Sequence, residues 1–283
     1  METKIITEGL SSLSDEMAKK YDIYLIRSYI IYGDKNLKEE VDIKLDDYYA
    51  EMVESQKIRK TAHANYHDLK VAFETVRQKS DQILYLAATS KLTGTYQLAQ
   101  AICKEYGSEK IKAYDTESLI GVQGIMAIEA AIMGTEGKTP AEICKFLDQE
   151  KPYMGVLGAL ETLKYLAASG RIGKAKALFG NLLSIKPIIG LKDGEIAPVD
   201  RARTRNQALE KIIAYLQQKS QMFGRKKVKF FIEYLIVDDW LSTVKAVLEK
   251  NFACDKIEFS RASAAIGTHL GPGTWGINYY FYA

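Results

Sequence analysis

The segment "GTHLGPGTWG" (267–276) near the C-terminus combines a glycine pattern with His269, one of three histidines in 283 residues. Gly271, Gly273 and Gly276 spell G-x-G-x-x-G. A dinucleotide fingerprint needs a strand before it, a helix after it and an acidic residue about 20 positions further on. Only seven residues follow Gly276, and they are typical of a strand. The glycines therefore predict a turn, and His269 is the residue of this segment that could do chemistry.

A second candidate site lies in "ILYLAATSKLTGTYQLAQA" (83–101), where a buried strand enters a polar turn and a helix begins near Thr93. Open α/β sheets place ligands at the carboxyl ends of parallel strands. The Thr93 hydroxyl, the Gly94 backbone and the helix N-terminus can face an anion there. The same residues also suit an ordinary helix cap, and the pattern alone leaves both interpretations open.

Basic residues follow in two further segments. Arg171 stands next to glycines in "SGRIGKAKALFGNLLSIKPII" (169–189), where its planar guanidinium could reach a carboxylate or a phosphate. Small residues there allow a close backbone approach: Ala175, Ala177 and Gly180. The segment "RARTR" (201–205) is either a solvated basic turn or a patch that docks a partner, formed by Arg201, Arg203 and Arg205.

Several other kinds of site are excluded or disfavoured. His63 and His67 have the i,i+4 spacing of metal ligands, but no third ligand is obvious, so we expect two solvated histidines at a helix start. No metalloprotease or nucleophile-elbow motif is present, and the three cysteines form no C-x-x-C pair. A net charge of +3 is too small to indicate a nucleic-acid partner.

The elements that would position these residues alternate between strand and helix. The expected strands include 4–7, 23–31, 81–88 and 110–115, and 119–133 reads as a buried helix. Such alternation predicts an α/β fold with a mostly parallel sheet in the first half. The second half is less regular and contains a hairpin with Asp193 and Gly194 at its turn. We expect two α/β domains, 1–152 and 153–283, with a mixed sheet in the second.

The chain begins without the basic and apolar regions of a secretory signal, and its longest apolar segment is too short to span a bilayer. Together with the unpaired cysteines, these features predict a cytoplasmic protein.

Three blocks of this sequence resemble the DegV family of fatty-acid-binding proteins. The blocks are "ATSKLTGTYQLAQ", "YLAASGRIGKAKALFGNLLSIKPIIGLKDGEIAPVDRARTRNQAL" and "IGTHLGPGTWGI", and the resemblance covers essentially the whole chain. It implies two α/β domains with a lipid between them, the acyl tail in an apolar tunnel and the carboxylate at the domain interface. It also implies a carrier without activity of its own, with the bound fatty acid in place of a cofactor.

The resemblance further implies a partner: a separate ATP-dependent fatty acid kinase that phosphorylates the carboxylate. The acyl phosphate then stays on the carrier until phospholipid synthesis, with at most transient contact with a membrane surface.

Carried onto this chain, the resemblance implies that Thr61, Thr93, Gly94 and His269 contact the carboxylate and that Arg171 lies close to the head-group opening. Two departures stand out. The family usually reads T-S-Q-P-S from Thr61, where this chain has Ala62, His63 and Ala64. It usually reads D-S-T after the first strand, where this chain has Glu8, Gly9 and Leu10. These departures suggest an altered ligand or kinase interface.

Two other functions remain open at this stage. A stand-alone enzyme would use His269 as a base or nucleophile toward a small ketone or acyl substrate, in line with the related fold of dihydroxyacetone kinase subunits. Alternatively, the departures near Glu8 and Ala62 would mark a family member that has lost its function.

Overall fold

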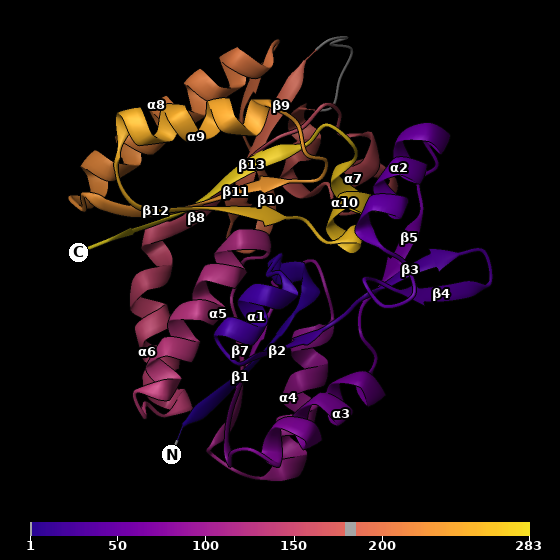
Figure 1. Cartoon of the computed structure of the whole chain (residues 1–283), viewed down its shortest axis with the longest axis vertical. Coiled ribbons are helices and arrows are strands. Elements are labelled where there is room, and N and C mark those ends of the chain that lie inside the picture. The colour runs from indigo at the N-terminus through magenta and orange to yellow at the C-terminus, as the bar shows by residue number, and fades with distance from the viewer. Residues whose placement is uncertain (1, 179–184) are drawn as a thin grey trace.

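The computed structural model describes residues 2–178 and 185–283, which form two stacked lobes (Figure 1). Gly180 of the long middle block lies outside the described residues. The sheet of the lower lobe has four strands, all parallel, in the order β2 (Ile23–Ile26), β1 (Thr3–Glu8), β6 (Gln82–Ala87), β7 (Ile111–Asp115). These strands run from the end that holds the N-terminus toward the upper lobe (Figure 1).

The parallel sheet is covered by helices on both faces. The helices of this lobe are α1 (Asp15–Lys20), α3 (Tyr66–Arg77), α4 (Thr95–Tyr106), α5 (Ile120–Thr135) and α6 (Pro140–Glu150). Ile83 and Tyr85 pack with α3 and α4, whereas Leu84 and Leu86 pack with α5 and α6. This alternation follows the period of two along a strand, and it explains why β6 is buried at every position.

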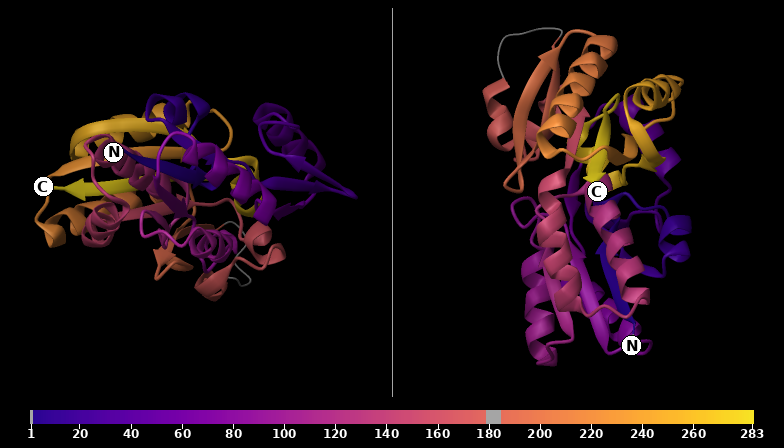
Figure 2. Two further views of the ribbon diagram at one scale, coloured as in Figure 1. Left: turned by 90° about the horizontal axis from the view of Figure 1, so that it is seen from below. Right: turned by 90° about the vertical axis from the view of Figure 1, so that its left-hand side faces the viewer.

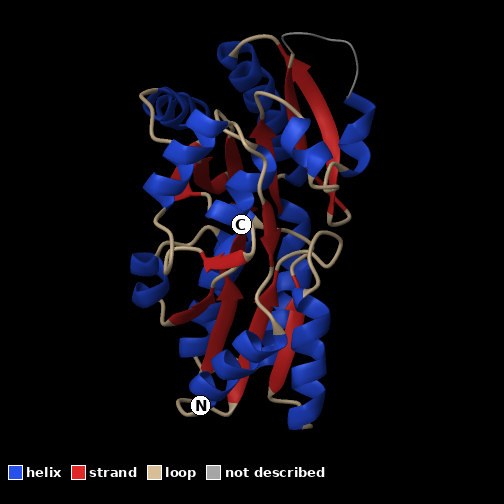
Figure 3. Ribbon diagram, turned by 90° about the vertical axis from the view of Figure 1, so that its right-hand side faces the viewer, coloured by secondary structure: helices blue, strands red, loops and turns tan. Residues whose placement is uncertain are grey.

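The upper lobe contains a mixed sheet of six strands. Their order is β10 (Glu195–Ala202), β9 (Lys186–Lys192), β8 (Met154–Ala159), β13 (Trp275–Tyr282), β11 (Lys227–Tyr234), β12 (Ala253–Arg261). Among the described strands of this sheet, only β11 and β12 pair in parallel. The helices α8 (Arg205–Phe223) and α9 (Trp240–Asn251) pack on one face. The right-hand view of Figure 2 shows this lobe above the parallel-sheet lobe, and Figure 3 shows helices flanking the strands in both.

The helix α5 joins the two lobes. It contacts β1 and β6 of the parallel sheet and β8, β11 and β13 of the mixed sheet, so twelve of its sixteen residues are buried. Two glycines permit this close approach: a Cβ on Gly134 would lie 2.2 Å from the Thr3 carbonyl oxygen, and one on Gly121 2.5 Å from Asn278 Nδ2. A helix that is apolar all round suits this position between two sheets.

A small antiparallel sheet and three short segments complete the surroundings of the site. The sheet has the order β4 (Lys35–Lys38), β3 (Tyr29–Tyr32), β5 (Lys60–Ala62). The remaining helices are α2 (Leu45–Ser55), α7 (Lys164–Ala168) and α10 (Ala264–Leu270), with 3-10 turns at Gly9–Ser11, Lys151–Tyr153 and Gly173–Leu178. The helix α10 packs against α2, α7, β3 and β5.

The predicted mixed α/β fold is confirmed, and so is the buried helix at 119–133. The hairpin forms with Asp193 and Gly194 at its turn, both with positive φ, as a type I′ turn requires. The boundary at residues 152 and 153 stays a prediction. In the part of the chain that the structure describes, no helix combines the length and the apolar character needed to cross a membrane.

The single strand expected over 23–31 is wrong. The chain ends β2 at Ile26 and begins β3 in a different sheet at Tyr29. The two residues between them are buried and polar: Arg27 pairs with Asp15 and Glu40, and the Ser28 backbone N–H donates to the Glu39 carboxylate at 3.1 Å. These partners turn the chain away from the parallel sheet, and nothing local in the apolar run reveals them.

Candidate functional site

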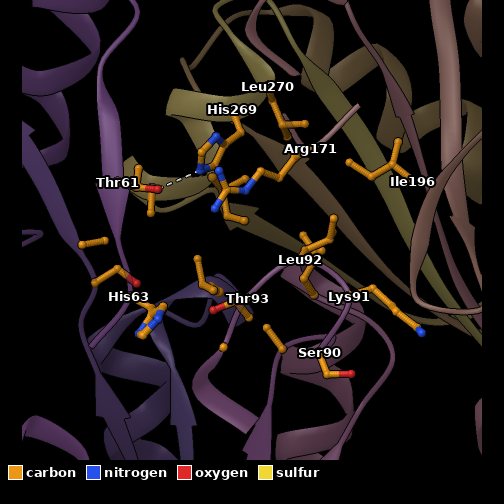
Figure 4. Close-up of a pocket in the computed structure, with 18 of the residues that line it drawn as sticks. Thr61, His63, Ser90, Lys91, Leu92, Thr93, Arg171, Ile196, His269 and Leu270 are labelled. Atoms are coloured by element: carbon orange, nitrogen blue, oxygen red, sulfur yellow. Dashed lines mark hydrogen bonds between the residues drawn. The ribbon is translucent and has the colours of Figure 1, made fainter. Parts of the chain in front are cut away.

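A cavity of about 680 Å³ lies where the carboxyl end of β6 meets α10, β5 and the segment after α7. Its walls combine polar groups from both lobes with apolar side chains, among them Leu92, Leu119, Leu166, Ile196, Ile266 and Leu270. Figure 4 shows His269 and Arg171 on one side of the cavity and Thr93 and His63 on the other. Its volume is in the usual range for small-molecule sites, roughly 300–1,000 Å³.

Thr61 and His269 meet in this cavity although 208 positions separate them. The Thr61 hydroxyl and His269 Nε2 are 2.8 Å apart and share a hydrogen bond (Figure 4). Thr61 comes from β5, and His269 from the last turn of α10 rather than from the turn expected in the sequence. The glycine turn begins two residues later, where Gly271 and Gly273 adopt φ of 79° and 78°.

The position of α10 depends on a close contact with α2. The Tyr49 hydroxyl donates to the carbonyl oxygens of Ala262 and Ser263, just before α10 begins. A Cβ on Gly267 would lie 2.3 Å from the Tyr49 ring. The glycine is therefore required for the approach that sets His269 opposite Thr61.

Burial and, to a smaller extent, the positive charge of Arg171 lower the pKa of His269 to about 4, which favours the neutral ring at physiological pH. Its Nδ1 is buried and has no hydrogen-bond partner among the described residues. A neutral imidazole bonded through Nε2 can present Nδ1 to a ligand as donor or acceptor, according to its tautomer.

Thr93 and Gly94 stand at the N-terminus of α4, on the other wall. The Thr93 hydroxyl is buried without a partner in the described part of the chain. The helix begins at Thr95, two residues later than expected, with Gly94 as N-cap and no side chain capping its first turn. The free N–H groups and the helix dipole of such an end favour an anion.

Glu8 of β1 forms a hydrogen bond to this end of α4. Its carboxyl group is buried and accepts hydrogen bonds from the Ala88 backbone N–H at 2.9 Å and the Thr95 hydroxyl at 2.8 Å. Burial raises the pKa of Glu8. Within the segment that departs from the family pattern, Glu8 therefore links β1 to β6 and α4 by hydrogen bonds, and Leu10 lines the cavity.

Arg171 lies at the cavity, and the three arginines of the "RARTR" segment do not. Arg171 is exposed just after α7, and its Nη1 donates to the Ser169 carbonyl oxygen at 2.6 Å. Arg201 and Arg203 are exposed elsewhere on the upper lobe. Arg205 pairs with Asp238 at 2.6 Å and lines a separate cleft of about 150 Å³ beside Trp240 and Trp275.

Both His63 and His67 are exposed, as expected of solvated histidines. His63 also lines the cavity beside Gly94, which the sequence did not predict. The helix α3 begins only at Tyr66, where Asn65 and Asp68 form a capping box. His63 therefore lies between β5 and α3, in the segment that joins them.

Comparisons with known proteins assign the chain to a family. The model of the DegV family, whose description calls its members uncharacterised, matches residues 2–281. A DegV domain-containing protein of Clostridium perfringens is 29% identical over 286 residues, covering 99% of each chain. One from Caldanaerobacter subterraneus is 27% identical over 273 residues, covering 96% of each.

Solved structures of this family have the same fold. A fatty-acid-binding DegV family protein from Thermus thermophilus superposes with a TM-score of 0.92 at 24% identity, covering 100% of each chain. A DegV lipid-binding protein from Thermotoga maritima reaches 0.87 at 25% identity, with 99% of each covered. DegV from Bacillus subtilis, described as a fatty-acid-binding protein, reaches 0.88 at 23% identity, with 100% of each covered.

Proposed function

Because the chain belongs to the DegV family, we propose that it binds a long-chain fatty acid in the cavity between its lobes. It presents the carboxylate to a separate ATP-dependent fatty acid kinase, in the cytoplasm. The observation that carries the proposal is the meeting of Thr61, Thr93 and His269 at one apolar cavity. The fatty-acid-binding and lipid-binding descriptions of structural relatives support the same ligand class.

The head group suits the polar wall. A buried carboxylate is costly unless it accepts hydrogen bonds. The unpartnered Thr93 hydroxyl and His269 Nδ1 can each donate one, and the N-terminus of α4 at Gly94 adds backbone N–H groups. A hydrogen bond to a charged group contributes roughly 1.5–3 kcal/mol.

The acyl tail accounts for most of the affinity. Each buried methylene contributes about 0.8 kcal/mol, so a tail of ~16 carbons offers on the order of 12 kcal/mol before ordering costs. Leucine and isoleucine side chains from both lobes supply the apolar surface, among them Leu92, Leu166, Ile196 and Leu270. A change to one head-group hydroxyl should therefore weaken binding only in part.

A carrier is favoured over a stand-alone enzyme that uses His269. A histidine base is normally oriented by an acidic or carbonyl partner on its second nitrogen. Nδ1 of His269 has no such partner in the described residues, and the cavity lining contains no carboxylate. A base with a pKa of about 4 is also poorly matched to chemistry at neutral pH.

The first experiment tests the ligand. Protein purified from its cells is extracted with organic solvent, and the extract is analysed by mass spectrometry. We expect one long-chain fatty acid per protein, and the delipidated protein should take it up again. The proposal is refuted if the protein neither carries nor takes up such a fatty acid.

The second experiment tests the kinase role. Loaded protein is mixed with ATP and a fatty acid kinase, and acyl phosphate is trapped with hydroxylamine. In this reaction the γ-phosphoryl group passes from ATP to a carboxylate oxygen, leaving ADP. We expect His269→Ala to reduce transfer more than binding, because positioning matters most for transfer. The exposed Arg201 and Arg203 are proposed to dock the kinase, and their replacement should raise the KM for the carrier without changing lipid content.

A further inference from the structure

His63 is an exposed histidine that lines the cavity and has no role in the proposed carboxylate site. It directly follows β5, which carries Thr61, and both residues line the cavity. Figure 4 shows the His63 ring near Thr93, across the cavity from His269. The two imidazoles therefore border the same space from opposite lobes.

The hydrogen bonds of His63 fix which nitrogen faces the cavity. Its Nδ1 lies 2.8 Å from the carbonyl oxygen of Ala64. A carbonyl can only accept, so Nδ1 carries a hydrogen, and Nε2 of the neutral ring carries a lone pair. Nε2 lies beside Gly94, 3.3 Å from where a Cβ on that glycine would stand, and has no hydrogen-bond partner among the described residues.

This arrangement makes the protonated ring the form that suits an anion. The lone pair of a neutral Nε2 would face a bound carboxylate oxygen, whereas a protonated Nε2 donates to it and Nδ1 keeps its bond to Ala64. Imidazole is the side chain whose charge changes between pH 5 and 8. His269 does not share this role, because its burial favours the neutral ring.

The charged groups around His63 are few. Glu8 of β1 interacts electrostatically with His63 from beneath the N-terminus of α4. Asp68 of α3 is already paired with Lys38 and Tyr29. Arg171 and Lys91 are the basic residues that line the same cavity in the described part of the chain.

We propose that His63 is a specificity-determining residue of this site, which takes up one proton when an anionic head group binds beside Gly94. The inference rests on the proposed function, because it concerns the same cavity and the same ligand class. It distinguishes this chain from the T-S-Q-P-S pattern, whose glutamine would occupy the position of His63 and cannot titrate.

The test uses two ligands whose own charge does not change with pH. Hexadecyl sulfonate is an anion throughout, and hexadecanol is neutral, so only the first engages an ionised His63. Their dissociation constants are measured at pH 5.5, 7.0 and 8.5 for the wild type, for His63→Gln and for His67→Gln as a matched control on the exposed face of α3. Calorimetry in buffers of different ionisation enthalpy counts the protons taken up.

We expect the wild type and His67→Gln to bind the sulfonate roughly tenfold more tightly at pH 5.5 than at pH 8.5, with proton uptake near pH 7. His63→Gln should lose both effects and bind hexadecanol as the wild type does. If both ligands bind but the pH dependence persists in His63→Gln, or is absent from the wild type, the role of His63 is overturned. If neither ligand nor any fatty acid binds the wild type, the proposed function itself fails.

Discussion

Glu233→Gln should stabilise the protein, increasingly so as the pH rises. Glu233 lies on β11, and its carboxyl group is almost fully buried where the mixed sheet meets α5. Asn278 Nδ2 donates to Glu233 Oε2 at 3.2 Å, while Oε1 has no hydrogen-bond partner in the described residues. Burial raises the pKa of Glu233 from 4.5 to about 8, so the folded protein holds it protonated at neutral pH.

The magnitude follows from proton linkage. In the unfolded chain this carboxyl ionises above pH 4.5, and keeping it protonated in the fold costs 1.36 kcal/mol for each further pH unit. At pH 7 the cost reaches ~3 kcal/mol, and above pH 8 it levels off near ~5 kcal/mol. Glutamine has the shape of the protonated acid and no such cost, so its gain should be absent at pH 4.5 and grow from there.

Urea unfolding at pH 4.5, 7.0 and 8.5 measures this gain as a difference in unfolding free energy. Glu258→Gln on the neighbouring strand β12 is the control, because Glu258 makes a partly exposed ion pair with Lys256, and such pairs contribute little. A difference between Glu233→Gln and wild type that stays constant with pH would refute the linkage argument. A loss of stability at pH 8.5 would show instead that the carboxyl group is needed as an acceptor in its ionised form.

Three further results are expected. Gly267→Ala should lower the free energy of unfolding in urea by roughly 1–3 kcal/mol, because the added Cβ would clash with Tyr49. Gly158→Ala is the control, because a Cβ there would make only ordinary contacts. Equal losses of stability in the two variants would contradict this reasoning. The melting temperature of the wild type should fall as the pH drops from 6.5 toward 4, because the fold favours neutral His269. This fall should be smaller in His269→Asn. A melting temperature that depends on pH equally in both proteins would contradict the prediction. Thr93→Val should leave the free energy of unfolding in urea unchanged or raised, and should weaken fatty-acid binding several-fold in titrations. A large loss of stability would show that the Thr93 hydroxyl stabilises the fold.

The strand β6 and the turn before α4 could be predicted from the sequence because their signals are local. A continuous apolar run marks a strand covered on both faces, and a hydroxyl and a glycine mark the start of a helix. The meeting of Thr61 with His269 has no such local signal. It depends on α10 packing against α2 and β5, through a contact of Gly267 with Tyr49 that only the tertiary structure contains.

The place of His63 beside the cavity also lies beyond the sequence pattern. The i,i+4 spacing of His63 and His67 suits one face of a helix, but His63 precedes the helix. Asn65 and Asp68 form a capping box, which places the first helical residue at Tyr66. That signal is local, but it does not show that His63 borders the same cavity as Thr61.

Two buried polar groups of the cavity lack hydrogen-bond partners in the described residues, which favours a role in ligand binding. A buried hydroxyl or ring nitrogen without a hydrogen-bond partner costs about 1–3 kcal/mol, and natural sequences keep such groups mainly at functional sites. Neighbouring hydroxyls of the same wall are satisfied: Thr89 donates to Gly194 and Thr95 to Glu8. Thr93 and His269 are the exceptions, and they border one cavity from opposite lobes. A carboxylate between them would accept a hydrogen bond from both and offset the cost of leaving them unpartnered.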